Sequence, residues 1–287
     1  MQSLYDVPAP AKLNLFLHVT GRRSDGYHLI QSVFMLIDWC DTLHFERLAT
    51  SAEVTREDLN SCLPDVDLTV RAARALQQAT GCSQGVRIRI QKSIPAEAGM
   101  GGGSSDAATT LLALNRLWGL NLSCAALQKI GLSLGADVPF FLHGRNAWVE
   151  GIGETITPLE KAHQLPQARF AVVKPAAGLE TKAIFSSPFL KCDTDSATIL
   201  GFAAAHFDFG RNDLQPVAQA LCSEIAEAVH WLKQRGLQAR MTGSGSAVFA
   251  QMSSDAIDLD GAPQGWQVKV CDNLMFHPLA GWASDEN

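Results

Sequence analysis

The amino-acid sequence predicts a mixed α/β protein built from two domains. Segments in which apolar and polar residues alternate, as in half-buried strands, are interleaved with segments whose apolar residues recur at helical spacing. The 287 residues suffice for one large domain or two ordinary ones. The pattern lapses into a polar link at residues 158–167, and a second set of strands and helices follows. We therefore expect one domain at residues 1–157 and another at residues 158–287.

The composition argues against several classes of protein. Hydrophobic residues make up 47% of the chain and charged residues 18%, which is typical of a globular enzyme with a substantial core. The formal net charge of −6 comes without a basic stripe, so we expect no nucleic-acid partner. No apolar run has the length of a membrane span, and residues 1–6 do not resemble a signal peptide, so we expect no membrane partner either.

The seven cysteines are scattered, and no two of them form a C-x-x-C pair. Their odd number and irregular spacing argue against a disulfide framework and against a zinc site. The eight histidines show no metal-ligand spacing. Together these features predict a cytoplasmic protein.

The first predicted strand is residues 12–19. Its leucines share one face, which is expected to join the core, and Lys12 and Asn14 lie together on the other face. This segment alone favours a solvated lysine on an edge strand. A functional pair of Lys12 and Asn14 is the alternative.

A loop at residues 20–26 contains the turn dipeptide Asp-Gly and leads to a second extended run at residues 27–37. That run opens with an aromatic residue beside a histidine, Tyr27 and His28. Such a pair more often packs in the ordinary way, but it can also stack on a planar ligand and hydrogen-bond it. Residues 42–48 continue the strand pattern, so we expect a β-meander.

The central feature is a glycine-rich segment between a strand and a helix. Residues 86–90 alternate as a strand, and residues 107–118 have helical spacing that ends at Gly119. The glycines of residues 99–103 let an anion approach backbone N–H groups, and the helix end adds unpaired donors. This combination favours a phosphate-binding loop, with a flexible helix-capping loop as the alternative. The segment lacks the lysine of a P-loop and the third glycine of a dinucleotide fingerprint.

Helices are predicted on both sides of this segment. Residues 68–79 form a helix that Asp65 or Asp67 caps and Gly81 ends, and Ser123 caps a further helix after the glycine-rich segment.

Asp137 follows that helix among apolar residues. It can cap a short helix that has Pro139 in its first turn. Alternatively, its carboxylate is partly desolvated and serves as a base or an ion-pair partner. Glu150 and Glu154, in a predicted hairpin at residues 146–157, are the other acidic candidates for a metal or proton role.

The second unit alternates strands and helices. A helical turn is expected at residues 181–185, and a longer helical stretch capped by Asn212 or Asp213 extends toward Gly236. The expected strands are residues 170–174, 239–241, 247–250 and 267–271. A tight turn of small residues, 242–246, joins the second and third of them.

Taken in order, these motifs resemble those of the GHMP kinases, small-molecule ATP kinases that lack a P-loop. The three family motifs correspond to PAKLNL at 10–15, the glycine-rich segment at 95–105 and TGSGSA at 242–247. SDGYH at 24–28, LGADVPF at 134–140 and EGIGE at 150–154 resemble the members that phosphorylate a diphosphocytidyl methylerythritol in non-mevalonate isoprenoid biosynthesis. The resemblance spans about residues 8–250.

The resemblance implies a fold, cofactors and catalytic residues. A ribosomal-protein-like N-terminal domain would bind ATP, a ferredoxin-like α/β C-terminal domain would lie on the substrate side, and the ligands would occupy the cleft between them. Asp137 would take the proton of the substrate's 2-hydroxyl, while Lys12 holds Asp137 ionised and neutralises charge on the transferred phosphoryl group. The cofactors would be ATP and Mg²⁺; the resemblance leaves the ligands of the metal open, with Ser105 as one candidate.

The resemblance also implies two groups of binding residues. Those for ATP would be Pro95, Ala96, Glu97, Ala98, Gly99, Met100, Gly101, Gly102, Gly103, Ser104, Ser105, Gly243, Ser244 and Gly245. Those for the substrate would be Asn14, Tyr27, His28, Thr181 and Phe185, with Tyr27 and Phe185 on either side of the cytosine. Residues 96–98 depart from the family's longer glycine run. Because a carboxylate repels a triphosphate, Glu97 is expected to point away from it or to lie at the adenine end.

Two other functions stay open on the sequence, as does the oligomeric state. The same kinase fold could act on mevalonate, homoserine or a sugar. Kinase activity that does not require a cytosine-containing substrate would indicate this alternative. The chain could instead be a non-catalytic binding module, since the N-terminal architecture of this family resembles a ribosomal-protein domain. The acidic balance argues against RNA binding, and the presence of both Lys12 and Asp137 argues for catalysis.

Overall fold

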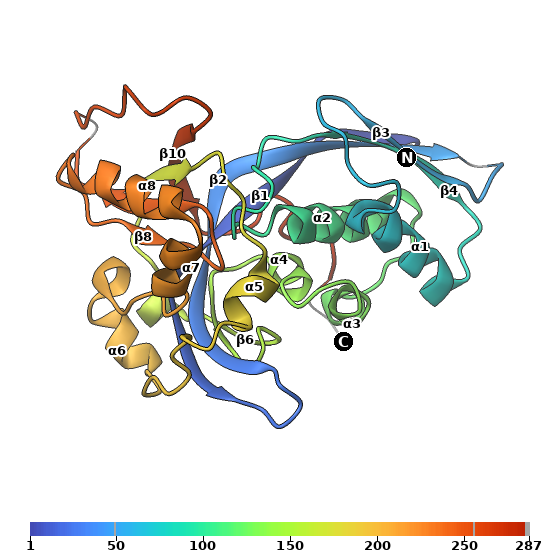
Figure 1. Cartoon of the computed structure of the whole chain (residues 1–287). Helices are drawn as coiled ribbons and strands as arrows, with labels where there is room; N and C mark the ends of the chain where they lie inside the picture. The colour runs from blue at the N-terminus through green and yellow to red at the C-terminus, as the bar shows by residue number, and fades with distance from the viewer. Residues whose placement is uncertain (49, 255, 285–287) are drawn as a thin grey trace.

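The structure is a computed structural model that describes residues 1–48, 50–254 and 256–284. Its strands form a ten-stranded sheet covered by helices, so the mixed α/β architecture predicted from the sequence is confirmed (Figure 1). The main path of the sheet is β3 (Val54–Asp58), β4 (Gly85–Gln91), β2 (His28–Leu48), β10 (Gln267–Leu274), β7 (Arg169–Lys174), β9 (Val248–Met252) and β8 (Arg240–Met241). β1 (Ser3–Arg22) and β5 (Ala147–Glu150) also pair with β2, and β6 (Thr155–Pro158) pairs with β5.

The helices lie in two groups against this sheet (Figure 1). One group covers the half that contains β3 and β4: α1 (Leu68–Thr80), α2 (Gly102–Leu117), α3 (Cys124–Leu132) and α4 (Val138–His143). The other lies at the β8 end: α6 (Ile199–Ala203), α7 (Gln215–Leu221) and α8 (Ser223–Lys233). α5 (Thr181–Phe185) lies between the groups, and two short 3₁₀ helices are Lys161–His163 and His206–Asp208. In the part of the chain that the structure describes, no helix is both long and apolar enough to cross a membrane.

The two longest strands, β1 and β2, run through both halves of the molecule (Figure 1). β1 is longer than the predicted strand at residues 12–19, and β2 joins the two strands predicted at 27–37 and 42–48. Nearly every residue of β1 between Val7 and Val19 is buried, so both faces of the strand are covered and the predicted solvated face does not exist. Pro8 and Pro10 fit inside β1 because this strand pairs with β2 alone.

Three hydrophobic clusters hold the layers together. The first packs α1 to α4 against the sheet and includes Phe45 and Leu111. The second includes Phe16 from the first half of the chain and Phe170 from the second. The third packs α7 and α8 on β7 and β9 and includes Leu232. Because the sheet and the second cluster continue past residue 157, the division into domains 1–157 and 158–287 stays a prediction.

Local signals in the sequence located several helix ends. The Asp67 carboxylate accepts a hydrogen bond from the Val70 N–H at the start of α1, and Gly81 ends that helix in the left-handed conformation. Ser123 caps α3 by accepting from the Ala126 N–H. These predictions are confirmed.

The continuous helix predicted toward Gly236 is wrong. α7 and α8 are separate because Cys222 between them has an extended backbone, with φ −141° and ψ 104°. The predicted cap at Asn212 or Asp213 is also wrong, because the N-cap position of α7 is Leu214 and no side chain caps the helix. Asn212 Oδ1 accepts from the Leu214 N–H in the turn before α7, and Asp213 accepts from the Val19 N–H of β1.

Candidate active site

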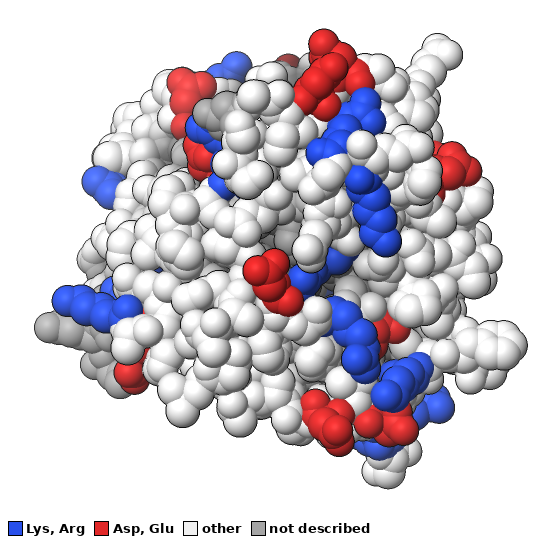
Figure 2. All heavy atoms as spheres, turned by 90° about the vertical axis from the view of Figure 1, so that its left-hand side faces the viewer, with Lys and Arg blue, Asp and Glu red and all other residues white. Residues whose placement is uncertain are grey.

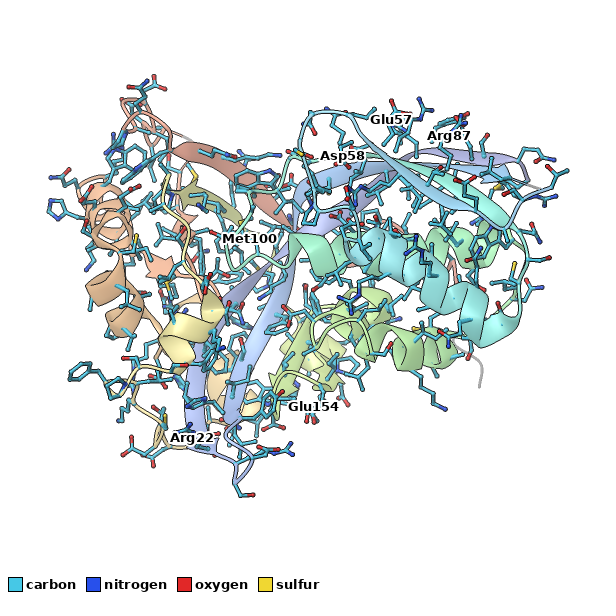
Figure 3. All side chains as sticks on the ribbon, turned by 45° about the vertical axis from the view of Figure 1, so that its right-hand side comes forward. Arg22, Glu57, Asp58, Arg87, Met100 and Glu154 are labelled. Atoms are coloured by element: carbon cyan, nitrogen blue, oxygen red, sulfur yellow. The ribbon has the colours of Figure 1, made fainter. Side chains whose placement is uncertain are left out.

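A cavity of about 710 Å³ opens where β1 passes the beginning of α2. Its lining includes Lys12, Asn14, residues 94–104, Asp137, residues 179–181, Phe185 and residues 243–245. Figure 3 places Met100, from the middle of the glycine-rich segment, at the centre of the molecule beside α2. The cavity therefore brings together residues from all three motifs that the sequence predicts to be functional.

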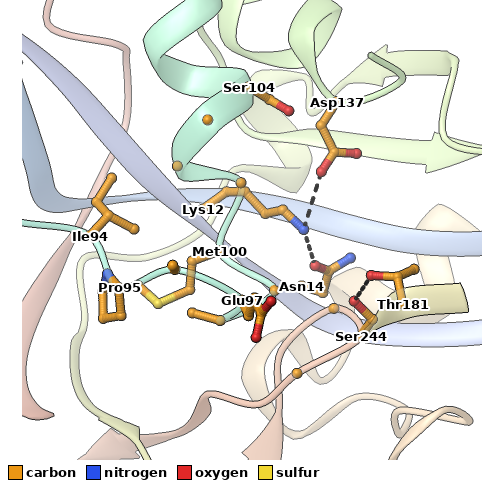
Figure 4. Close-up of a pocket in the computed structure, with 18 of the residues that line it drawn as sticks. Lys12, Asn14, Ile94, Pro95, Glu97, Met100, Ser104, Asp137, Thr181 and Ser244 are labelled. Atoms are coloured by element: carbon orange, nitrogen blue, oxygen red, sulfur yellow. Dashed lines mark hydrogen bonds and ion pairs between the residues drawn. The ribbon is translucent and has the colours of Figure 1, made fainter. Parts of the chain in front are cut away.

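Lys12 forms the floor of this cavity with a side chain that is only 5% exposed. Its Nζ lies 3.6 Å from Oδ2 of Asp137, donates a hydrogen bond to Oδ1 of Asn14 and lies 4.6 Å from the ring centroid of Phe34 (Figure 4). Burial lowers the pKa of Lys12, and the negative charge of Asp137 opposes this shift. The interpretation of Lys12 as a solvated edge lysine is therefore wrong.

Asp137 lies at the N-cap position of α4, with Pro139 in the first turn as predicted. Its side chain makes no capping hydrogen bond, and its carboxylate faces Lys12 across the cavity with 31% of its surface exposed (Figure 4). The predicted ion pair is thus present, and the predicted cap is right in position but makes no side-chain hydrogen bond. The role of Asp137 as a base stays a prediction.

The other two acidic candidates are engaged elsewhere. Glu150 accepts a hydrogen bond of 2.7 Å from the side chain of Gln31. Glu154 accepts one of 2.5 Å from the N–H of Ile152, within its own hairpin turn, and Figure 3 shows it apart from Met100. Neither is among the described residues that line the cavity.

The beginning of α2 faces the cavity with free backbone donors. The helix starts at Gly102, so Gly102 and Gly103 belong to its first turn rather than to the loop. The first helical hydrogen bond runs from the Ser105 N–H to the Gly101 carbonyl, which leaves the N–H groups of residues 102–104 without a helical acceptor. Gly101 has φ 71°, and a Cβ there would lie 3.0 Å from the Phe141 ring. Orphan donors and the helix dipole together suit a phosphate group.

The turn at residues 242–246 is bonded directly to the glycine-rich segment. The N–H of Ser246 donates to the carbonyl oxygen of Glu97 at 2.9 Å, and the N–H of Ala247 donates to that of Ala98 at 3.2 Å. The N–H of Gly245 is used inside the turn. The family resemblance would place the N–H groups of Gly243 to Ser246 near the phosphates, but those of Gly245 and Ser246 are bonded within the protein itself.

Glycine is required where these two loops touch. A Cβ on Gly99 would lie 2.4 Å from the carbonyl oxygen of Thr242, and a Cβ on Gly243 would lie 2.7 Å from that of Gly99. Both residues also have positive φ angles, 69° and 53°. Gly99 and Gly243 therefore allow the glycine-rich segment to pack against the turn at residues 242–246, whereas Gly101 to Gly103 face the cavity.

Glu97 turns its carboxylate toward the segment that follows β7. A Cβ added to Gly178 would meet Oε2 of Glu97 at 1.8 Å, so the carboxylate lies directly over Gly178. Burial lowers the pKa of Lys174, and the charge of Glu97 acts against that shift. Figure 4 shows Glu97 pointing away from Ser104 and α2.

The residues predicted to bind the substrate fall into two sets. Thr181 and Phe185 line the cavity, and the Thr181 hydroxyl shares a hydrogen bond of 2.7 Å with that of Ser244 (Figure 4). Tyr27 and His28 do not line the cavity, and Tyr27 is 60% exposed. The rings of His28 and Phe185 lie 5.1 Å apart with an interplanar angle of 36°. The structure thus brings His28 to Phe185, and the sandwich of cytosine between Tyr27 and Phe185 stays a prediction.

Sequence reasoning missed an ionic cluster beside the cavity. Lys92 and Asp106 line the cavity, and Nζ of Lys92 hydrogen-bonds both Asp106 and the fully buried Asp41. Burial raises the pKa of Asp106 to about 8, with Lys92 opposing the shift and Asp41 adding to it. No local pattern marks this cluster, because its members come from β2, from the residue after β4 and from α2.

No group of three or more His, Cys, Asp and Glu side chains within the described ranges could hold a metal ion. Kinases usually hold Mg²⁺ through one or two protein oxygens and the phosphates of the nucleotide, so a smaller donor set suffices. The Ser104 hydroxyl lines the cavity at the start of α2 and fits such a role. Ser105, the predicted candidate, is fully buried, and its hydroxyl has no hydrogen-bond partner among the described residues.

The face shown in Figure 2 carries both signs of charge. Lys and Arg side chains follow one another in an interrupted column to the right of the centre, and Asp and Glu side chains lie beside this column at several points.

Comparison with known proteins relates both halves of the chain to one superfamily. Residues 67–145 match the GHMP kinases N terminal domain, and residues 198–258 match the GHMP kinases C terminal family. A protein of Paracidovorax citrulli named 4-diphosphocytidyl-2-C-methyl-D-erythritol kinase is 70% identical over all of this chain and all of its own length. One of the same name from an Acidovorax species is 71% identical over 98% of this chain and 99% of its own.

Solved structures agree with these matches. A crystal structure of 4-(cytidine 5'-diphospho)-2C-methyl-D-erythritol kinase aligns with a TM-score of 0.76 and 31% identity, covering 92% of this chain and 98% of that one. A homoserine kinase from Cytophaga hutchinsonii aligns with a TM-score of 0.69 and 16% identity over 96% of each chain. The second likeness shows a shared fold and nothing more.

Proposed function

Because the chain belongs to the 4-diphosphocytidyl-2-C-methyl-D-erythritol kinases, a family of GHMP kinases, we propose that it phosphorylates the 2-hydroxyl of that compound with ATP in non-mevalonate isoprenoid biosynthesis. The observation that carries this proposal is the pairing of Lys12 with Asp137 in the cavity that the three motifs line. The pair stands beside the free N–H groups at the start of α2, where a phosphate would be held.

The proposed reaction is an in-line transfer of the γ-phosphoryl group. A bond forms between the substrate's 2-oxygen and the γ-phosphorus, and the bond from that phosphorus to the β,γ-bridging oxygen breaks, so that ADP leaves. The proton of the hydroxyl passes to Asp137, whose exposed carboxylate faces the cavity. The N–H groups of residues 102–104 orient the phosphates. When bound, Mg²⁺ would neutralise phosphate charge, and the Ser104 hydroxyl in the cavity would help to hold it.

Lys12 has two tasks in this proposal. Its ammonium pairs with the Asp137 carboxylate, and it offsets the negative charge that develops on the transferred phosphoryl group. The Asn14 amide orients it: Oδ1 accepts from Lys12, and Nδ2 donates to the Ser32 hydroxyl at 2.9 Å. Since both ends of this amide are occupied, we assign Asn14 chiefly to the orientation of Lys12 and only secondarily to substrate contact.

The cytidyl group is assigned to the end of the cavity that contains α5. Phe185 offers a ring for stacking, and His28 lies against that ring. Burial lowers the pKa of His28, so its imidazole is neutral at pH 7 and presents one donor and one acceptor to the polar edge of the base. Thr181 and Tyr27 complete the proposed set.

The other functions considered are not favoured. Identity of 70% over the whole chain links this protein to kinases named for the cytidyl substrate rather than to those named for mevalonate or homoserine. A binding module would not need the Lys12–Asp137 pair. We also propose a cytoplasmic location, on the ground of the scattered cysteines.

A coupled assay of ADP release tests the proposal. Purified protein with MgATP is given 4-diphosphocytidyl-2-C-methyl-D-erythritol, mevalonate or homoserine in separate reactions. We expect turnover with the cytidyl substrate alone. Turnover with another acceptor would support a kinase activity but refute the assignment of His28 and Phe185 to the cytosine. Folded protein that turns over none of the three acceptors would refute the proposal.

A further inference from the structure

One buried cluster, formed by Asp41, Lys92 and Asp106, anchors both ends of the glycine-rich segment. We propose that Asp41 is a positioning residue for the nucleotide, acting through Lys92 and Asp106 on the segment between them. The inference rests on the proposed function, because it takes residues 95–105 as the site of the ATP phosphates.

The first end of the segment is held by Asp41 itself. This residue lies in β2, its side chain is fully buried, and its Oδ1 accepts hydrogen bonds from the N–H groups of Ser93 at 2.5 Å and Ile94 at 2.8 Å. Such bonds from backbone donors to a carboxylate are about twice as strong as those between neutral groups. The chain is therefore fixed to the sheet immediately before Pro95.

The second end is held through Lys92. Nζ of Lys92 donates a hydrogen bond to Oδ2 of Asp41 and another to Oδ2 of Asp106. Asp106 lies in α2 and is only 2% exposed. Packing reinforces this link, since a Cβ on Gly102 would lie 3.1 Å from Cγ2 of Ile94 and 3.6 Å from Oδ2 of Asp41. The beginning of α2 is thus held against the residues that precede the loop.

Asp41 acts without touching the ligand. Lys92 and Asp106 are among the residues that line the cavity, whereas Asp41 is not. Its effect on the nucleotide must therefore pass through the position of the segment and of the N–H groups at the start of α2. These donors need a fixed separation from the Lys12–Asp137 pair, because phosphoryl transfer depends on how the reacting groups are placed.

The test is the Asp41→Asn variant, which keeps an oxygen acceptor for the Ser93 and Ile94 N–H groups but loses the charge that binds Lys92. We expect its Kd for a non-hydrolysable ATP analogue, measured by calorimetry, to rise about tenfold, the loss expected for one charge-assisted hydrogen bond. The KM for the cytidyl substrate should change less than about twofold, because only the nucleotide side is displaced.

Asp272→Asn is the matched control. It also removes an aspartate charge, from the pair of Arg169 with Asp272 that links β7 and β10 away from the loop, and it should leave both constants unchanged. If Asp41→Asn does not fold, Asp106→Ala decides, because it removes the oxygen that accepts from Lys92 and so unties α2 from the cluster, and the same loss of nucleotide affinity is expected.

Three results would overturn the inference. An unchanged Kd for the nucleotide analogue would show that the anchor does not position the loop. Equal weakening of nucleotide and cytidyl substrate would indicate a general loss of structure. Failure of the unsubstituted protein to bind the analogue would refute the proposed function, and this inference with it.

Discussion

The Ser246 N–H donates a hydrogen bond of 2.9 Å to the carbonyl oxygen of Glu97, and this bond joins two loops that are far apart in the sequence. The neighbouring bond from Ala247 to Ala98 extends the contact into a short backbone pairing. Residues from the C-terminal half of the chain therefore shape the segment on which the phosphates are proposed to lie. The contact is tight enough that glycine is needed at Gly99.

The first prediction concerns Gly99→Ala. The new Cβ would approach the Thr242 carbonyl oxygen to 2.4 Å, so the two loops must separate. We expect the KM for ATP to rise about tenfold, together with a fall in Tm, because displacement of the loop moves the phosphate donors. Gly119→Ala is the control: its φ of 67° imposes similar left-handed strain of about 1 kcal/mol, but nothing lies within 4 Å of its Cβ position. A rise in KM of the same size in both variants would contradict the steric explanation.

The second prediction concerns Asp137→Asn. Loss of the base should lower kcat by about 10² to 10⁴, the range typical of general-base removal, while ATP and substrate bind nearly as before. Because the buried Lys12 loses the opposite charge of Asp137, the Tm should also fall, although the helix cap is unaffected. Steady-state kinetics and thermal unfolding measure the two effects. Normal turnover combined with a lowered Tm would return Asp137 to a purely structural role.

The third prediction concerns Phe185→Ala. Removal of the ring that lies against His28 should raise the KM for the cytidyl substrate several-fold more than the KM for ATP. Phe189→Ala is the control, since this nearby phenylalanine is 88% exposed and does not line the cavity. Initial rates at varied concentrations of each substrate give both constants. An equal effect on the two constants would remove Phe185 from the cytosine site.

The fourth prediction concerns pH and Asp106. Its pKa of about 8 in the folded protein exceeds that of an unfolded carboxyl, about 4, so the folded state keeps a proton that the unfolded chain releases. Through this group, the free energy of unfolding falls as the pH rises from about 4 to about 8, and then levels off. Asp41 and Lys92 are the charged groups that face it.

Asp106→Asn removes this titration. The Tm of the variant minus that of the unsubstituted protein should therefore increase steadily from pH 5 to pH 8 and stay constant above, in thermal unfolding at matched ionic strength. A difference that is independent of pH over this range would show that Asp106 is ionised in the folded protein.

The sequence predicted the parts of the site that depend on short motifs. Lys12, Asp137 and the glycine-rich segment each belong to a contiguous pattern, and all of them line one cavity. The burial of Lys12 was not predictable, because the strand pattern of β1 shows only which residues share a face, not that the second face is covered as well. That covering comes from elements far along the chain, such as Thr242, whose hydroxyl accepts from the Asn14 N–H.

The features that the sequence did not predict depend on tertiary contacts. Asp41, Lys92 and Asp106 each look like ordinary polar residues of a strand, a loop and a helix, and only folding brings them together. The break at Cys222 was equally unpredictable, because no glycine or proline marks the position at which its backbone becomes extended. The motifs therefore predicted which residues line the site, whereas the residues that hold them in place are determined by long-range packing.

The position of β10 has a consequence for the synthesis of the protein. This strand comes last in the chain, yet it lies between β2 and β7 and pairs with both, so it closes the sheet between the two halves. On the ribosome, β2 and β7 emerge long before β10, the strand that joins them. Until β10 is made, the backbone groups of each strand that will bond to β10 are unpaired. A nascent chain arrested before residue 267 would expose these edges to other chains and invite aggregation. The sheet between the two halves is thus completed only after β10 has been synthesised.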